Sequence, residues 1–300
     1  MRKLWPSAWI PVICLALVVF SHVAQASSHR ITAFNVQIFG RAKMAKPLPA
    51  QILPEIMTRS QLPFLQEIRD KSDKAINQLM DTIHETHPNY DLLLSPALGR
   101  TRSKEKYAYI YDSSLLRPVT SFVLEDPDDV FEREPYVALW EDTTGAHLVT
   151  IGIHVKPSAV PEELAHLASY AERLSKLGLS HILILGDLNA DCRYLEPDEP
   201  FILPNLSYFT SLIDNSIDTT TTATDCTYDR FLASPDLTDD VSDGDIFDHQ
   251  SYFGLSLEES RLISDHYAIE LFWHSQSASD SKDWRRRVFS NMPQFGIPSP

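Results

Sequence analysis

The sequence predicts an α/β fold: a four-layer α/β/β/α sandwich with two packed, mainly antiparallel sheets inside and helices outside. Three observations support this prediction. Apolar stretches typical of strands alternate along the chain with amphipathic stretches typical of helices. The 300 residues are 43% hydrophobic, which is enough for a substantial core. The chain has no internal repeat and no Gly/Ser-rich linker, which favours one domain.

Helices are expected where apolar residues recur every three or four positions. The stretch 72–86 repeats them at i, i+3, i+4 and i+7 from Ile76, with Ser72 as the expected N-cap and Pro88 as the stop. The expected helices cover 51–57, 72–86, and the stretch from Pro161 to just before Gly178.

Strands are expected at short apolar runs. The run 106–111 alternates and predicts a half-buried strand, whereas 148–154 is more continuously apolar. The expected strands cover 31–36, 106–111, 148–154, 181–185 and 267–273.

The first 26 residues read as a signal peptide. A basic start precedes an apolar run, and Ala24-Gln25-Ala26 is typical of a cleavage site. We therefore expect a secreted protein, periplasmic or extracellular, with no membrane segment in its mature form. The alternative is an uncleaved N-terminal anchor, although the apolar run is short for a bilayer.

The mature chain is expected to hold a catalytic domain over 27–274 and a flexible tail over 275–300. The tail is polar and then basic, with an arginine cluster at 285–287. A solvated tail and a contact with nucleic acid both fit that composition.

Cleavage would leave two of the three cysteines, Cys192 and Cys226. In an oxidising compartment such a pair predicts a disulfide, worth about 3–4 kcal/mol for a loop of this length. The alternative is two buried free thiols.

Net charge limits how this chain can bind nucleic acid. The formal charge is −15, and losing Arg2 and Lys3 changes it to −17. Such a chain does not attract DNA by bulk charge. It remains compatible with an enzyme whose carboxylates hold divalent cations, since the cations supply local positive charge.

Polar side chains follow three expected strands. The strand 181–185 ends in Gly186-Asp187-Leu-Asn189, His154 closes 148–154, and Ser264-Asp265-His266 opens the last strand. Acids, amides and histidines gathered at strand ends favour metal-assisted phosphodiester cleavage. For Asp187 and Asn189 the alternative is a turn-forming Asp-x-Asn.

In these segments the chain resembles the deoxyribonuclease I family of the endonuclease/exonuclease/phosphatase superfamily. The resemblance runs from about 31 to 273 and implies a divalent-metal-dependent endonuclease that leaves 5′-phosphate and 3′-hydroxyl ends on DNA. The matching segments are Ala33–Gly40, Leu65–Asp70, Leu98–Arg100 with Lys104-Glu105, Phe131–Pro135, His154, Gly186–Ala190, Cys226–Arg230 and Ser264–Tyr267.

The resemblance assigns proton transfer to His154 and His266, oriented by Glu105 and Asp229 respectively. Imidazole suits this chemistry because it titrates near neutral pH. Either histidine could be the acid or the base. Asp187 and Asn189 are expected around the attacking water and the phosphate; as residues two apart at a strand exit, they should project to the same side.

Two metal sites are implied. The expected catalytic site holds Mg²⁺ (or Mn²⁺) with Glu67, Asp265, Asn35 and Asp187. A structural Ca²⁺ is expected at Asp218, Thr220, Thr222 and Thr224, whose oxygens would point one way in an extended loop. A threonine-rich surface loop is the alternative there. Asp129 and the carbonyl of Phe131 resemble part of the family's other calcium loop.

Arg69 and Arg133 match family positions that contact DNA, with a structural ion pair as the alternative for each. The family's minor-groove tyrosine is replaced by Ser103, preceded by Arg102, so a charge contact is expected to replace stacking. The loop between Asp126 and Phe131 is shorter than in the family and lacks its small disulfide.

Two other functions remain open. One is another phosphoester hydrolase of the superfamily, such as a sphingomyelinase or an inositol phosphatase. The other is a catalytically inactive binding protein. DNA is the expected partner and the protein is expected to be a monomer; some relatives bind actin, but no residue here supports it.

Overall fold

Two six-stranded sheets form the centre of the computed structural model, which describes residues 27–101, 104–195 and 208–275. The first sheet has the order β11-β12-β1-β2-β4-β3, and only its β1/β2 pair is parallel. Its strands are β1 (Ser27–Phe39), β2 (Leu62–Ile68), β3 (Tyr90–Leu94), β4 (Lys106–Asp112), β11 (Asp245–Phe247) and β12 (Ala268–Ser275).

The second sheet has the order β5-β6-β7-β8-β10-β9, and only its β7/β8 pair is parallel. A parallel pair needs a crossover connection, and the helix α4 supplies it between β7 and β8. The strands are β5 (Leu116–Val123), β6 (Tyr136–Asp142), β7 (His147–Gly152), β8 (Ile182–Asp187), β9 (Thr210–Ser211) and β10 (Asp229–Ala233).

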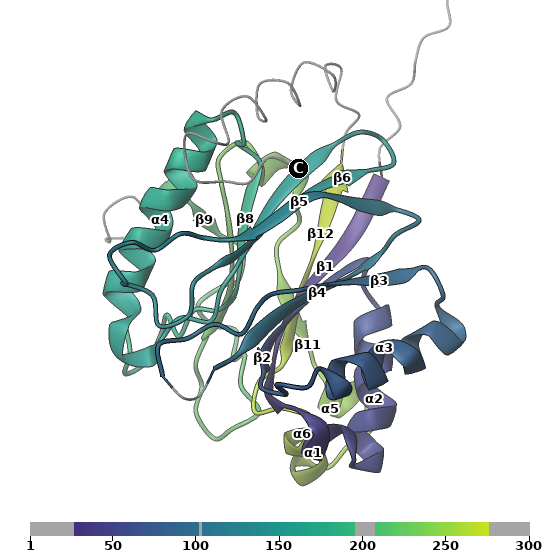
Figure 1. Cartoon of the computed structure of the whole chain (residues 1–300). Helices are drawn as coiled ribbons and strands as arrows, with labels where there is room; N and C mark the ends of the chain where they lie inside the picture. Colours follow the sequence, from purple (N-terminus) through teal and green to yellow (C-terminus); the bar gives the residue numbers. More distant parts are fainter. Residues whose placement is uncertain (1–26, 102–103, 196–207, 276–300) are drawn as a thin grey trace, which may run out of the picture.

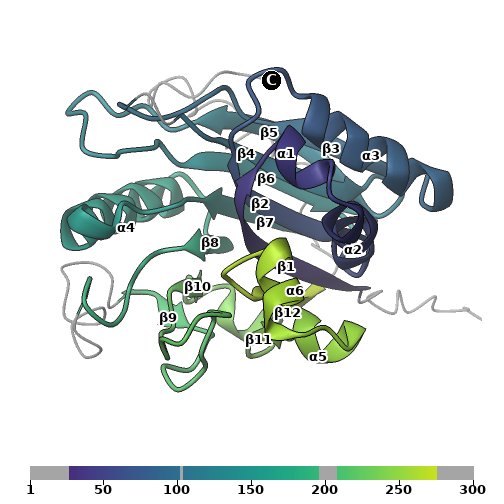
Figure 2. The ribbon, with the colours of Figure 1, turned by 90° about the horizontal axis from the view of Figure 1, so that it is seen from below.

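Helices cover the outer face of each sheet, which confirms the predicted sandwich (Figure 1, Figure 2). A short 3-10 turn (Pro157–Ala159) leads into α4 (Val160–Lys176), which lies on the second sheet. Another 3-10 turn, Thr238–Asp240, precedes β11. The first sheet is covered by α1 (Arg41–Met44), α2 (Pro47–Thr58), α3 (Lys74–Thr86), α5 (His249–Phe253) and α6 (Leu257–Ile263).

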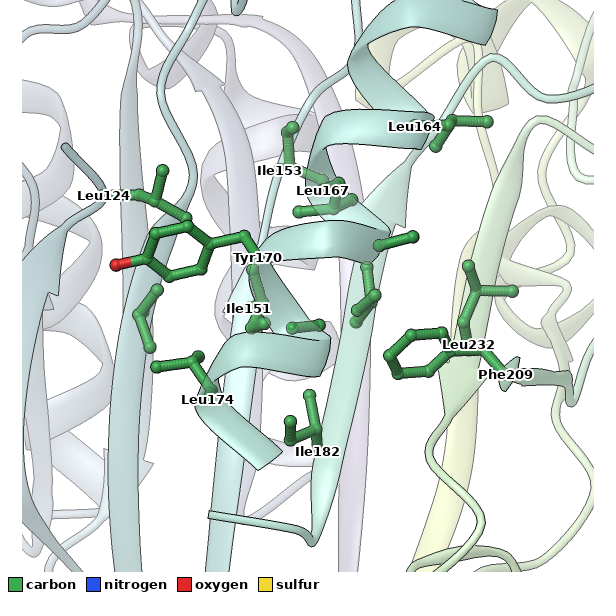
Figure 3. Packing of buried hydrophobic residues seen from close by; sticks show 14 of the residues in the cluster. Leu124, Ile151, Ile153, Leu164, Leu167, Tyr170, Leu174, Ile182, Phe209 and Leu232 are labelled. Atoms are coloured by element: carbon green, nitrogen blue, oxygen red, sulfur yellow. The ribbon is translucent and has the colours of Figure 1, made fainter. Parts of the chain in front are cut away.

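Three apolar layers hold these four layers together. One lies between the sheets, one under the helices of the first sheet, and one under α4. In the last, Leu167 and Leu174 of α4 pack towards Ile151 and Ile182 of the parallel pair β7/β8 (Figure 3). The apolar residues that recur every three or four positions in α4 thus form one face of the helix, and this face is buried against the sheet.

The strand β4 corrects one expectation. The run 106–111 was predicted to be half-buried, yet Tyr107 through Ile110 are all fully buried. The reason is its place inside the first sheet, between β2 and β3. Its tyrosines face the layer between the sheets, while Ala108 and Ile110 face the helices, so both sides are covered.

The observed start of α3 also differs from the predicted one. Ser72 is not its N-cap; Asp73 holds that position, with a left-handed backbone and no side-chain cap bond. The carboxylate of Asp70 instead accepts the backbone N–H of Ala75 at 2.9 Å and that of Ser72 at 3.0 Å. An aspartate outside the helix therefore satisfies an orphan N–H that the expected cap would have bonded.

The last strand reaches one residue further than the predicted domain. Ser275 ends β12, pairs with Ser27 of β1, and is buried against Asp142. Residues 276–300, the rest of the predicted tail, and the expected signal peptide (1–26) lie outside the described residues. Within the described ranges, no helix is long and apolar enough to cross a membrane.

We expect Leu167→Ala to lower the free energy of unfolding by about 2–5 kcal/mol, because it leaves a cavity under α4 that the sheet cannot fill. Urea unfolding measures the change. Leu257→Ala is the matched control, since Leu257 is 46% exposed and the same truncation should there cost well under half as much. Equal losses would mean that α4 does not pack as described.

Candidate active site

Polar side chains from both sheets meet at one end of the sandwich. Asn35 and Glu67 come from the neighbouring parallel strands β1 and β2. Asp187 and Asp229 are paired at the ends of β8 and β10 in the second sheet. His154 follows β7, whose parallel pairing with β8 brings it to the same edge as Asp187. Strand pairing thus gathers residues that are far apart in the sequence.

His154 is held by a buried carboxylate. Its Nδ1 lies 2.9 Å from Oε2 of Glu105, and the two side chains are 8% and 1% exposed. Its backbone N–H donates to the hydroxyl of Tyr107 at 3.0 Å. Because Nδ1 faces the carboxylate, Nε2 is the nitrogen left for chemistry, and it points to the centre of the site.

His266 is held in the same way from the other side. Its Nδ1 lies 2.7 Å from Oδ2 of the fully buried Asp229. Its backbone N–H donates to Ser264 Oγ at 3.1 Å, and this hydroxyl donates to the carbonyl of Asn35 at 2.6 Å. The loop before β12 is therefore fastened to β1.

Asp187 lies between the two histidines. Its Oδ2 is 3.5 Å from Nε2 of His154 and 3.7 Å from Nε2 of His266. The same oxygen accepts the amide of Asn35 at 3.0 Å. Two imidazoles that face one carboxylate, each backed by its own acid, can donate and accept protons on a substrate bound between them.

Buried charges set the protonation of these pairs. Burial alone would raise the pKa of Glu105, but the hydrogen bond and charge of His154, with the charges of Arg133 and Arg69, lower the pKa from 4.5 to about 2. Burial would lower the pKa of His266, yet nearby carboxylates, Asp229 foremost, raise the pKa from 6.5 to about 10. The surrounding carboxylates therefore favour the imidazolium form of His266.

Oxygen-bearing groups line the first-sheet side of the site. Glu67 accepts the amide of Asn35 at 3.2 Å through Oε1 and the N–H of Ile38 at 2.8 Å through Oε2. Asp265 accepts the amide of Gln37 at 2.8 Å. The backbones of Gln37, Ile38 and Glu67 are left-handed, which bends both strands where the polar groups must face inward. The site residues Glu67, Glu105 and His154 bring one donor atom each within 4.8 Å of one another.

Several known proteins are similar to this chain in sequence. The family model "Endonuclease/Exonuclease/phosphatase family" matches residues 33–266. Mouse deoxyribonuclease-1-like 2 is 34% identical (89% of this chain, 98% of the relative), and human deoxyribonuclease-1 is 32% identical (85% and 96%). The chain belongs to the deoxyribonuclease I family. It is a phosphodiester hydrolase of that type.

Solved structures share the fold at low identity. An endonuclease/exonuclease/phosphatase family protein from Bacteroides thetaiotaomicron gives a TM-score of 0.55 at 16% identity (83% of this chain, 98% of that one). A mannosyl-6-phosphatase of the same organism gives 0.55 at 14% (81% and 98%). These likenesses show the superfamily fold and nothing finer.

The backbone at Asn189 differs from the extended strand exit that the sequence predicted. Its backbone is left-handed rather than extended. Its N–H donates to Asp187 Oδ1 at 3.0 Å, the bond of the turn-forming alternative, and its amide donates to the carbonyl of Val155 at 3.0 Å. The residue stays at the site but is aimed by a turn.

The four predicted calcium ligands do converge, although their loop bends over 221–224 rather than extending. The hydroxyl of Thr220 lies 2.9 Å from Asp218 Oδ1, 3.2 Å from Thr222 Oγ1 and 3.5 Å from Thr224 Oγ1. A compact turn, not strand alternation, brings the oxygens together. Thr220 also forms a β-bridge with His266, which places the cluster beside the candidate active site.

The predicted second calcium loop is bonded to an arginine. Asp126 Oδ2 accepts the N–H of Phe131 at 2.8 Å, and Asp129 has a left-handed backbone. Arg100 donates to the carbonyls of Asp129 at 2.7 Å and Val130 at 3.2 Å. A guanidinium thus lies against the loop where the family comparison implied a cation.

The two arginines expected at DNA both contact Glu105. Arg69 Nη2 donates to Glu105 Oε1 at 2.8 Å and keeps 33% of its side chain exposed. Arg133 lies 3.5 Å from the same oxygen, donates through Nε to the carbonyl of His154, and is only 10% exposed. Arg133 therefore forms the structural ion pair that was the alternative to a DNA contact. Arg102 and Ser103 lie outside the described residues.

Cys192 and Cys226 form the disulfide that their number predicted. It ties the segment after β8 to the segment before β10, so it closes the loop that carries the threonine cluster. Thr219 and Cys226, on the two arms of that loop, are also joined by a backbone hydrogen bond of 3.1 Å.

Two further residues that build the site were not identified as site residues from the sequence. Gln66 is fully buried; its amide donates to the carbonyl of Ile153 at 2.6 Å and its oxygen accepts the N–H of Asp187 at 3.0 Å. Lys43 is 8% exposed and donates to the carbonyls of Val36 and Ile263, both at 2.6 Å. The available signal for Gln66 was an amide inside an otherwise apolar strand.

We expect the stability contribution of Glu105 to vanish in acid. A carboxyl whose pKa falls from 4.5 to about 2 on folding stabilises the fold above pH 4.5 by about 3 kcal/mol, and this is lost as the pH falls towards 2. Urea unfolding of wild type and Glu105→Gln should therefore differ most near pH 6 and converge towards pH 2.5. Glu55→Gln, an exposed control, should show no such trend. A difference in the free energy of unfolding between wild type and Glu105→Gln that did not change with pH would contradict this explanation.

Proposed function

We propose that this protein is a secreted, divalent-metal-dependent endonuclease that cleaves DNA phosphodiester bonds to 5′-phosphate and 3′-hydroxyl ends. The observation that carries the proposal is the pair of carboxylate-backed histidines on either side of Asp187. The relatives named deoxyribonuclease, similar over most of the chain, support DNA as the substrate.

The electrostatics favour one assignment of acid and base. The buried carboxylate of Asp229 favours the protonated form of His266, so we assign His266 to protonate the leaving 3′ oxygen. His154 then takes the proton of the attacking water through Nε2, while Glu105 stabilises the imidazolium that forms. We assign Asp187 and Asn189 to orient the water and the phosphate.

The residues present fit a Mg²⁺ or Mn²⁺ ion. Glu67, Asp187 and Asp265 offer the hard oxygen donors that these ions prefer, and they lie beside the two histidines. The fourth proposed ligand, Asn35, turns its amide nitrogen to Glu67 and Asp187 and accepts the N–H of Gln37 with its oxygen. When bound, the ion would neutralise charge on the phosphate. Structural Ca²⁺ at the threonine cluster and export after cleavage near Ala26 complete the proposal.

Another phosphoester hydrolase is the alternative, since a mannosyl-6-phosphatase shares the fold. Fold alone does not separate the two functions. The identity of 32–34% to deoxyribonucleases favours DNA, and activity on DNA decides between them.

Supercoiled plasmid tests the function. With Mg²⁺ and Ca²⁺ the mature protein (27–300) should nick it, and EDTA should abolish nicking until Mg²⁺ or Mn²⁺ is returned in excess. His154→Ala and His266→Ala should each lose about 10²–10⁴-fold in rate, as expected for a general acid or base. Lys176→Gln, remote on α4, is the control. Intact plasmid with folded wild type would sink the proposal.

Calcium should stabilise the fold through the threonine cluster. At a Ca²⁺ concentration of 100 times its Kd, the free energy of unfolding should rise by about 2.7 kcal/mol. Asp218→Ala should remove most of this increase, whereas Asp214→Ala, an exposed aspartate on the same segment, should keep it. Thermal unfolding with and without Ca²⁺ measures both; equal increases in the two variants would place the ion elsewhere.

A further inference from the structure

A buried lysine joins the two segments that carry proposed metal ligands. Lys43 belongs to α1, and only 8% of it is exposed. Its ammonium donates to the backbone carbonyls of Val36 and Ile263, both at 2.6 Å. A buried charged group is costly unless hydrogen bonds satisfy it. Here those bonds link β1 to the end of α6, two segments that are far apart in the sequence.

Both carbonyls lie where regular structure is interrupted. The pairing of β1 with β2 shifts register between Asn35 and Phe39, so Val36 lies in the irregular stretch of the ladder. Ile263 is the last residue of α6, where the final carbonyls have no donor within the helix. The ammonium therefore binds one acceptor at a strand irregularity and one at a helix end.

The bend that follows Val36 holds two proposed metal ligands. The side-chain amide of Gln37 donates to Asp265 at 2.8 Å. The backbone N–H of Ile38 donates to Glu67 at 2.8 Å. Both bend residues have left-handed backbones, a conformation that persists only where the surrounding structure imposes it. By binding the carbonyl at the start of the bend, the lysine helps to impose it.

The second carbonyl precedes the other half of the site. Ile263 is followed directly by Ser264, Asp265 and His266. The hydroxyl of Ser264 donates to the carbonyl of Asn35 at 2.6 Å, so it joins the same two segments from the other side of the lysine bond. The position of the loop before β12 relative to β1 is thus set by the ammonium and this hydroxyl together.

The charge of the lysine acts on the same carboxylates. Burial lowers the pKa of Lys43 from 10.5 to about 8, while the charges of Asp265 and Glu67 act to raise it. The ammonium form therefore prevails at neutral pH. Its positive charge offsets part of the repulsion between carboxylates that must gather around one ion.

We propose that Lys43 is a positioning residue for the proposed catalytic metal ion. It holds the bend 36–38 and the loop 264–266 in their ion-binding arrangement before an ion is present. Glu67 and Asp265 then do not have to be brought together by the ion itself. This inference rests on the proposed function, because that function assigns these two carboxylates to the ion.

Manganese binding in the absence of DNA tests this role. Electron paramagnetic resonance measures free Mn²⁺, and the binding that is lost in Glu67→Gln defines the catalytic site. Lys43→Met should weaken this binding about 10–100-fold, as does the loss of other groups that orient metal ligands. Loss of a positive charge alone would strengthen the binding of a cation, so the direction of the change separates positioning from charge.

The matched control removes the same charge nearby. Lys46 is exposed three residues further along the chain, and Lys46→Met should bind Mn²⁺ at least as tightly as the wild type. Circular dichroism checks that each variant is folded. Lys43→Met with wild-type or tighter Mn²⁺ binding would overturn the positioning role.

Hydrogen exchange of the wild type tests the arrangement without any substitution. The backbone N–H of His266, which donates to Ser264 Oγ, should already be protected in the metal-free protein, because the loop is held without the ion. A His266 N–H that exchanges freely until Mn²⁺ is added would also overturn the proposal.

Plasmid nicking separates this inference from the proposed function. Lys43→Met should need more Mn²⁺ in proportion to its weaker binding, while its rate at saturating Mn²⁺ stays close to that of the wild type. If the wild type nicks DNA and Lys43→Met binds Mn²⁺ as the wild type does, only the positioning role fails. If Glu67→Gln loses no Mn²⁺ binding, the proposed metal site fails together with it.

Discussion

The active site depends on a buried glutamine that joins the two sheets. Gln66 sits in β2 of the first sheet, yet both ends of its amide bond the second, at Ile153 and Asp187. A buried amide is costly unless its donor and acceptor are both satisfied, so these bonds fix how far apart the sheet ends lie. Gly186 allows this contact: a Cβ there would lie 2.2 Å from the carbonyl of Ile153 and 2.6 Å from the glutamine nitrogen. Asp187 is thereby held where both histidines face it.

Much of the fold and the site could be predicted from the sequence because several of their signals are local. The helical period in 72–86 and in the stretch from Pro161 marks α3 and α4, and apolar runs mark β7 and β8. The pairs His154 with Glu105 and His266 with Asp229 came from the family resemblance. The structure brings both pairs within hydrogen-bond distance, while their roles in catalysis remain proposals.

What the sequence could not supply depends on contacts between distant segments or on side-chain bonds that compete with the expected local geometry. The tyrosines of β4 gave an alternating pattern, but their burial follows from the neighbouring strands and the second sheet. The cap of α3 and the turn at Asn189 are set by single side-chain bonds that compete with the expected geometry. The burial of β4 thus arises where tertiary packing overrides a local pattern, whereas the cap and the turn arise from short-range side-chain bonds.

Two histidines, each held by its own buried carboxylate, face Asp187, and the carboxylates around His266 favour its protonated form. Nuclear magnetic resonance of their ring nitrogens, in metal-free protein across a pH series, measures this directly. We expect a proton on Nδ1 of both rings and a His266 ring that stays doubly protonated through pH 8, losing a proton only near pH 10. A His266 ring that is neutral at pH 7, or an Nδ1 without a proton on either ring, would contradict the assignment of the acid and of the orienting carboxylates.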